Sequence, residues 1–122
     1  MGTGKKILVI EDSRMVLAMI KAMLEDVGFE VITAEKGQDG IDRARVYLPD
    51  LAIIDTLLPD TDGFEVCRQI RTFADSQKIK IVMMTGSVDA VDAVKARKMG
   101  ADDYVVKTMD MDIMLTAVKQ LI

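Results

Sequence analysis

The stretch Ile7-Leu-Val-Ile-Glu-Asp12 shows the pattern that decides the fold, which is a short apolar run ending in polar residues. Similar runs recur at Val31-Ile-Thr-Ala34, Leu51-Ala-Ile-Ile54, Ile81-Val-Met-Met84 and Tyr104-Val-Val106. Apolar runs rich in β-branched residues and separated by helical stretches are typical of a parallel sheet covered on both faces. We therefore expect an α/β fold in which five strand–helix units form one doubly wound sheet.

A helix is expected after each apolar run. The predicted ranges are 13–27, 38–48, 62 or 63–73, 88–99 and 110–122. Gly28 suits the left-handed position after the first helix, and Pro49 stops the second. In the second helix we expect Ile41, Ala44 and Leu48 to point toward the core.

Polar side chains follow four of the five runs, and these are Glu11 and Asp12, then Asp55, Thr85 and Lys107. All strands of a parallel sheet end on the same edge, and ligands bind at that edge where the strand order reverses. Three carboxylates favour a hard cation, whereas a lysine and a threonine favour an anion such as a phosphoryl group. The sequence therefore predicts one shared site.

Each of these residues also has an ordinary structural explanation. Glu11 and Asp12 could be acids at a solvated helix N-terminus, where acids are common. Asp55 could belong to a turn, and Lys107 could be a surface lysine. We favour a shared site because all of these residues fall on the same predicted edge.

Composition narrows the range of functions. The chain has 122 residues, so we expect one domain over residues 5–122, with residues 1–4 as a flexible lead or cloning remnant. A net charge of −4 argues against a nucleic-acid surface, and no apolar run is long enough to span a membrane. Cys67 is the single cysteine, and we expect a buried thiol in a cytoplasmic protein. With no histidine, the chain cannot use histidine-based catalysis.

Four motifs together resemble the receiver domain of two-component response regulators, over essentially the whole chain. They are the acidic pair at 11–12, the acceptor segment Asp55-Thr-Leu-Leu-Pro-Asp-Thr-Asp-Gly63, the hydroxyl segment at 84–86 and the closing segment at 100–107. The resemblance implies a flavodoxin-like (βα)5 domain with strand order 2-1-3-4-5, which places strands one and three side by side.

The resemblance also implies a role for each site residue. Asp55 would accept a phosphoryl group, and Mg2+ would be held by Asp12, Asp55 and the backbone carbonyl of Leu57. Glu11 would contribute through water or by orienting Asp12. Lys107 would neutralise charge on the transferring oxygens.

Two further residues are implied to act as a switch. Thr85 would contact a phosphoryl oxygen, and Tyr104 would then turn toward the interior and alter the surface of helix four, strand five and helix five. Met15 and Met19 lie off the core stripe of helix one, so they are either core filling or a docking patch for a partner.

Partners follow from the same resemblance. The phosphoryl donor would be a sensor histidine kinase or a histidine phosphotransfer protein. A C-terminal effector domain or a homodimer through helix four, strand five and helix five would receive the output. We expect a phosphoacceptor rather than an enzyme. Its self-dephosphorylation should be slow, because Leu57 and Ser87 are not the acid or amide that best orients a hydrolytic water.

The sequence departs from the family after Lys107, and it leaves other functions open. Thr108 stands where the family usually has a proline, which bears on the Lys107–Thr108 bond and on the reach of Lys107. A phosphatase of the haloacid dehalogenase type would need an aspartate at Leu57. The chain could also be a receiver-like interaction module that is never phosphorylated. Nucleotide binding is disfavoured because no glycine-rich phosphate loop is present.

Overall fold

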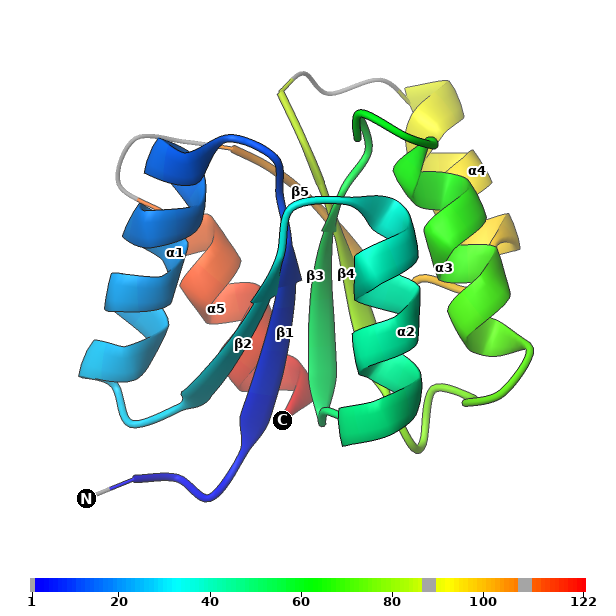
Figure 1. Cartoon of the computed structure of the whole chain (residues 1–122). Coiled ribbons are helices and arrows are strands. Elements are labelled where there is room, and N and C mark those ends of the chain that lie inside the picture. The colour runs from blue at the N-terminus through cyan, green and yellow to red at the C-terminus, as the bar shows by residue number, and fades with distance from the viewer. Residues whose placement is uncertain (1, 87–89, 108–110) are drawn as a thin grey trace.

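A five-stranded parallel sheet lies between two layers of helices (Figure 1) in a computed structural model that describes residues 2–86, 90–107 and 111–122. The strands are β1 (Lys6–Ile10), β2 (Glu30–Ala34), β3 (Leu51–Asp55), β4 (Lys80–Thr85) and β5 (Asp103–Val106). Their order is β2-β1-β3-β4-β5, which confirms the predicted doubly wound topology.

The helices divide into two groups. They are α1 (Arg14–Asp26), α2 (Gly37–Tyr47), α3 (Gly63–Arg71), α4 (Ala90–Lys98) and α5 (Asp112–Leu121). One sheet face is covered by α1 and α5, and the other by α2, α3 and α4 (Figure 1).

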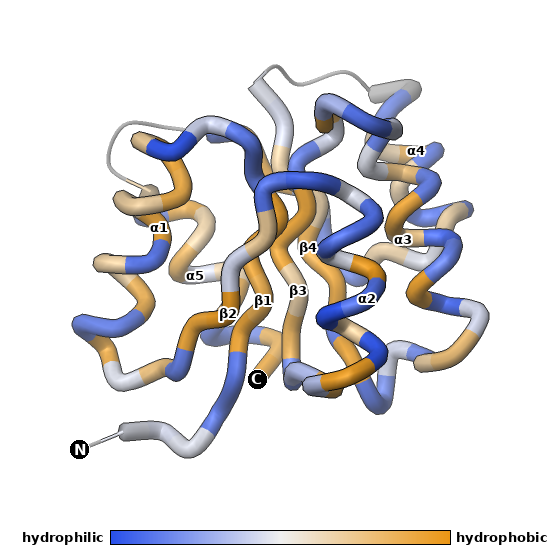
Figure 2. The backbone as a smooth tube through the Cα atoms, in the orientation of Figure 1, coloured by the Kyte–Doolittle hydropathy of each residue, from blue (hydrophilic) through white to orange (hydrophobic). Residues whose placement is uncertain are grey.

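The three inner strands, β1, β3 and β4, are buried on both sides because their residues alternate between the two cores, whereas the edge strands β2 and β5 stay partly exposed. In β1, Ile7 and Val9 join the cluster under α1 and α5, while Leu8 and Ile10 join the cluster under α2, α3 and α4. All four are fully buried. Figure 2 shows the resulting apolar strands between helices that carry both hydrophilic and hydrophobic residues. Continuous apolar runs, rather than alternating ones, are therefore what this sheet requires.

Local signals place the helix ends close to the predicted residues. The Ser13 side chain accepts a hydrogen bond from Val16 N, so Ser13 caps α1 rather than forming its first turn. Gly28 follows α1 with φ of 97°, as its left-handed position requires. The expected starts of the fourth and fifth helices, at 88 and 110, lie outside the described residues.

One inward-facing prediction is wrong. Ile41 and Ala44 are buried, but Leu48 is 58% exposed. Leu48 adopts a left-handed conformation at the C-terminal cap of α2, with φ of 46°, so the helix ends before its side chain would reach the core. Pro49 follows and cannot continue the helix.

At the start of the chain, Thr3 N donates to Gly28 O at 2.8 Å. The assignment of residues 1–4 as a lead segment stays a prediction. None of the described helices combines the length and the apolar character that a membrane crossing would need.

Candidate functional site

The carboxyl ends of β1 and β3 bring three acidic side chains together. These strands are neighbours, and Ile10 pairs with Ile54, so the residues that follow lie next to each other. One carboxylate oxygen from each of Glu11, Asp12 and Asp55 lies within 4.8 Å of the others. The predicted convergence of the three acids is confirmed.

The three acids differ in burial, and the difference suits a bound cation. Glu11 has no exposed surface and Asp55 is 4% exposed, whereas Asp12 is exposed. A cation could therefore enter past Asp12 and be held against the two buried groups. A cluster of oxygen donors carrying excess negative charge matches the preference of Mg2+ or Ca2+.

Lys107 reaches the cluster from the end of β5. Its Nζ donates to Asp55 Oδ2 at 2.9 Å and to Glu11 Oε1 at 3.1 Å, and it lies 3.0 Å from Glu11 Oε2. The backbone holds it there, because Lys107 N donates to Thr85 O at 2.7 Å. The predicted convergence of Lys107 with the acidic residues is thus present, between residues far apart in the sequence.

The surroundings of Glu11 make its ionisation less favourable than in water. Burial raises the pKa of Glu11 to about 7, and a hydrogen bond shared with Asp55 adds to the rise, while Lys107 opposes it. Burial by itself would lower the pKa of Lys107, but its hydrogen bonds to Asp55 and Glu11 outweigh that effect and raise the pKa. One ammonium among three carboxylates leaves the site with excess negative charge, which a divalent cation would balance.

The segment after Asp55 turns sharply and holds the Asp55 carboxylate from its other side. Leu57 N donates to Asp55 Oδ1 at 3.1 Å, so the two carboxylate oxygens have different partners. The Leu57 side chain is 78% exposed and points into solvent at the mouth of the site. Leu57 therefore contacts Asp55 through its backbone N–H rather than through its side chain.

Thr85 ends β4, the strand next to β3. It is buried, and the register places Asp55 opposite Met84, one residue before it. A cleft of about 310 Å³ opens beside these residues. Its lining includes Thr85 and Leu57 together with Lys95 of α4. A group that reaches Asp55 through this cleft would therefore pass the Thr85 hydroxyl and the Lys95 ammonium.

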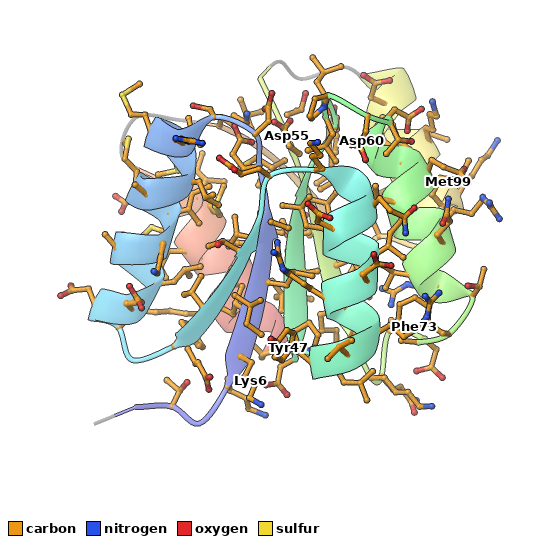
Figure 3. All side chains as sticks on the ribbon, viewed as in Figure 1. Lys6, Tyr47, Asp55, Asp60, Phe73 and Met99 are labelled. Atoms are coloured by element: carbon orange, nitrogen blue, oxygen red, sulfur yellow. The ribbon has the colours of Figure 1, made fainter. Side chains whose placement is uncertain are left out.

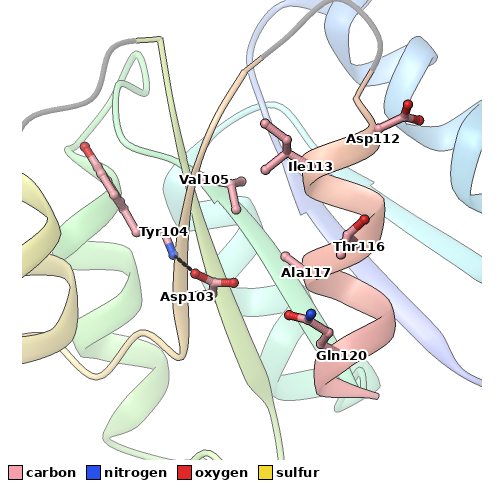
Figure 4. Close-up of a pocket in the computed structure, with 8 residues that line it drawn as sticks. All are labelled: Asp103, Tyr104, Val105, Asp112, Ile113, Thr116, Ala117 and Gln120. Atoms are coloured by element: carbon pink, nitrogen blue, oxygen red, sulfur yellow. Dashed lines mark hydrogen bonds between the residues drawn. The ribbon is translucent and has the colours of Figure 1, made fainter.

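Tyr104 lies on the face of the sheet that packs against α2, α3 and α4, whereas its neighbour Val105 faces α5. Figure 4 shows the Tyr104 ring directed away from α5. The Tyr104 hydroxyl oxygen is buried without a hydrogen-bond partner in the described part of the chain. The hydroxyl end of the ring is therefore buried, while the residue as a whole is partly exposed.

Two methionines of α1 lie near the acidic edge. Met15 is 72% exposed and Met19 is 38% exposed, so neither is core filling. They are one helical turn apart and share a face. The structure therefore leaves an apolar surface on α1.

Some site residues fall outside the structure's description, and others were missed from the sequence. Ser87 and Thr108 lie outside the described residues. Asp60 accepts hydrogen bonds from the first two residues of α2, although the sequence analysis gave it no role. The available signal was that α2 begins after Lys36, which is not a capping residue.

A second missed contact lies at the far end of α3. Arg71 Nη2 donates to Asp102 Oδ2 at 2.8 Å, and Arg71 also donates to the carbonyls of Gly100, Ala74 and Ile79. No local pattern indicates this contact, because it joins residues 31 positions apart in the chain.

Comparison with known proteins identifies this arrangement. The chain matches the sequence profile of the response regulator receiver domain over residues 7–119. It is 39% identical over 106 residues to the alkaline phosphatase synthesis transcriptional regulatory protein PhoP of Bacillus subtilis, covering 85% of this chain and 42% of PhoP. It is 35% identical over 117 residues to the phosphate regulon transcriptional regulatory protein PhoB of Rhizobium meliloti, covering 96% of this chain and 52% of PhoB. The chain thus spans about half the length of these relatives.

Solved structures agree with the sequence matches. The response regulator TrrA of Thermotoga maritima, in complex with Mg2+–BeF, superposes with a TM-score of 0.88 and 30% identity, covering 97% of this chain and 99% of TrrA. The BeF3-activated receiver domain of RstA from Klebsiella pneumoniae superposes with a TM-score of 0.86 and 28% identity, covering 94% of this chain and 96% of that chain.

Proposed function

The chain belongs to the receiver domain family of two-component response regulators, and from this premise we propose that Asp55 is its phosphoacceptor. The observation that carries the proposal is the environment of this carboxylate. Asp55 is almost fully buried, lies within a cluster of three acids, and accepts a hydrogen bond from Lys107 Nζ at 2.9 Å. A carboxylate that is both shielded and paired with a cation suits nucleophilic attack on a phosphoryl group.

The reaction would be transfer from a phosphohistidine of a partner protein. An Asp55 carboxylate oxygen forms a new bond to phosphorus while the phosphorus–nitrogen bond breaks, and that electron pair stays on the imidazole nitrogen. The product is an acyl phosphate. Lys107 stabilises the negative charge on the transferring oxygens, and Thr85 donates its hydroxyl to one of them.

The donor set fits Mg2+, which would neutralise phosphoryl charge when bound. Asp12, Asp55 and the Leu57 carbonyl would be its protein ligands, with Glu11 acting through water or orienting Asp12. The proximity of the three carboxylates supports this assignment. So does the TrrA structure, which is a complex with Mg2+–BeF.

The output would pass through Thr85 and Tyr104 to the surface formed by α4, β5 and α5. This surface holds an open pocket of about 370 Å³ between β5 and α5 (Figure 4), lined by Val105, Ile113 and Thr116 among others. A second copy of the chain or an effector domain would bind there. The greater length of the relatives supports an effector domain.

The upstream partner would be a sensor histidine kinase or a histidine phosphotransfer protein, and it would dock on α1 through Met15 and Met19. The exposure of both side chains supports this role. We place the protein in the cytoplasm, which agrees with its buried, unpaired Cys67. It would act as a phosphoacceptor rather than a turnover enzyme.

The test is labelling by acetyl phosphate, followed by intact mass. Wild-type protein should gain one phosphoryl group when Mg2+ is present and none when a chelator is added. Asp55→Asn should gain none under either condition. Equal labelling of the Asp55→Asn variant, or labelling that the chelator does not affect, would contradict the proposal.

A further inference from the structure

The segment 56–62, which joins Asp55 to α3, is closed at its stem by backbone contacts. Leu57 and Asp62 form an isolated antiparallel bridge, and Gly63 N donates to Thr56 O at 2.9 Å. These contacts hold the two ends of the segment together. They do not fix the position of the segment's tip, which depends on contacts with other parts of the chain.

Asp60, at the tip, is bound to the N-terminus of α2. Gly37 N donates to Asp60 Oδ1 at 2.8 Å, and Gln38 N donates to Asp60 Oδ2 at 3.0 Å. Both carboxylate oxygens are thus used by one helix end, whose own capping residue, Lys36, makes no side-chain cap bond. Figure 3 shows Asp60 beside the start of α2, on the same edge of the molecule as Asp55.

The close fit of the two elements shows that this contact is built into the packing. A side chain at Gly37 would collide with Thr61 Cγ2 and would place its Cβ 2.8 Å from Val66 Cγ2. Glycine at this position therefore lets the tip of the segment lie directly on the helix. The hydrogen bonds from Gln38 and Gly37 also lower the pKa of Asp60, so the carboxylate stays charged against the positive end of the helix dipole.

We propose that Asp60 is a positioning residue for the acidic site. By fastening the tip of segment 56–62 to α2, Asp60 restricts the motion of Leu57, whose backbone carbonyl would bind the cation and whose N–H already holds Asp55. Partners that orient metal ligands from outside the coordination shell commonly set metal affinity in this way. The inference rests on the proposed function, because it assumes that the cation binds beside Asp55.

The test separates fastening the segment from merely capping α2. Asp60→Ala removes both effects. Asp60→Asn keeps one acceptor oxygen and has the same net charge as Asp60→Ala. Lys36→Asn gives α2 a capping side chain of its own. Combined with Asp60→Ala, it restores both the helix cap and the wild-type net charge but leaves the segment unfastened. Each variant of the 122-residue chain is titrated with MgCl2 by calorimetry and melted in chelator.

We expect Asp60→Ala to weaken Mg2+ binding roughly tenfold, at the lower end of losses seen for outer-shell partners of metal ligands. Asp60→Asn should show a smaller loss, and it keeps the test valid if Asp60→Ala does not fold. The double variant should recover its melting temperature while its Mg2+ affinity stays low. Lys36→Asn alone should bind Mg2+ with an affinity close to that of the wild type.

Two results would overturn the inference about Asp60 and leave the proposed function intact. One is wild-type Mg2+ affinity in Asp60→Ala. The other is recovery of both melting temperature and affinity in the double variant, because Asp60 would then act only as a helix cap. Failure of the wild-type protein to bind Mg2+ would instead overturn the proposed function, and the inference with it.

Discussion

Glu11 is the residue that should give this protein a pH dependence near neutrality. It is completely buried, and burial raises its pKa to about 7. The chain has no histidine, and burial raises the pKa of the Cys67 thiol to about 11. Glu11 is therefore the side chain whose titration we expect to dominate between about pH 5 and pH 8.

The metal-free protein should lose stability as pH rises through this range. The pKa of Glu11 is raised from 4.5 in the unfolded chain to about 7 in the folded one, so the folded state binds more protons between these values. The stabilisation that the bound proton provides is complete below pH 4.5 and is lost as the pH rises through 7. The free energy of unfolding falls by about 3 kcal/mol in total. Urea unfolding in chelator, at several pH values, measures this change. Glu11→Gln should remove most of this pH dependence. If the free energy of unfolding of the variant changes with pH as much as that of the wild type, another group is responsible.

Leu57 is the residue expected to govern the lifetime of the phosphorylated state. It lies at the mouth of the site and offers no hydrogen-bonding side chain to a water approaching phosphorus in line. Leu57→Asn should speed the decay of isolated phosphoprotein roughly tenfold, if about 1.4 kcal/mol of barrier is removed. Leu57→Met, which stays apolar, should decay as slowly as the wild type. Equal or slower decay of Leu57→Asn would show that Leu57 does not screen the site.

At the scale of one element, α1 is expected to recognise the phosphoryl donor. Replacing both Met15 and Met19 by glutamine should slow transfer from a cognate phosphohistidine protein by about tenfold, equivalent to about 1.4 kcal/mol of lost docking energy. Labelling by acetyl phosphate should be nearly unchanged, because it needs no docking. Val46→Gln is a matched control, since Val46 is 74% exposed on α2 rather than α1. Loss of both reactions would indicate a folding defect instead.

At the scale of the whole molecule, the acidic site should link cation binding to stability. Three carboxylates held within 4.8 Å repel one another, and this repulsion destabilises the metal-free fold. A cation that binds only the folded state should raise the melting temperature, by about 2.7 kcal/mol of stability at a hundredfold excess over its Kd. Calorimetry with and without MgCl2 measures the rise. Asp12→Ala should abolish it, and Asp12 is exposed, so its removal leaves the core intact. An equal rise in the variant would place the cation elsewhere.

The sequence alone was enough to predict the order and approximate bounds of the elements, because their signals are local. Apolar runs such as 7–10 can be buried on both faces only in a covered sheet, and residues such as Gly28 and Pro49 mark helix ends directly. The convergence of Glu11, Asp55 and Lys107 was also predictable, because parallel strands end on one edge and strand order then decides which ends meet.

Tertiary structure alone decided how far each side chain is buried and which distant groups bind it. Leu48 carries a helical core pattern but is exposed, because the backbone leaves the helix at that residue. Glu11 differs in burial from its neighbour Asp12, and this difference raises its pKa. Asp60 looks like any loop acid until the packing of α2 brings the N–H groups of Gly37 and Gln38 within hydrogen-bonding distance. Solvent access and contacts between elements depend on the packing of the entire chain, and no local pattern of residues encodes them.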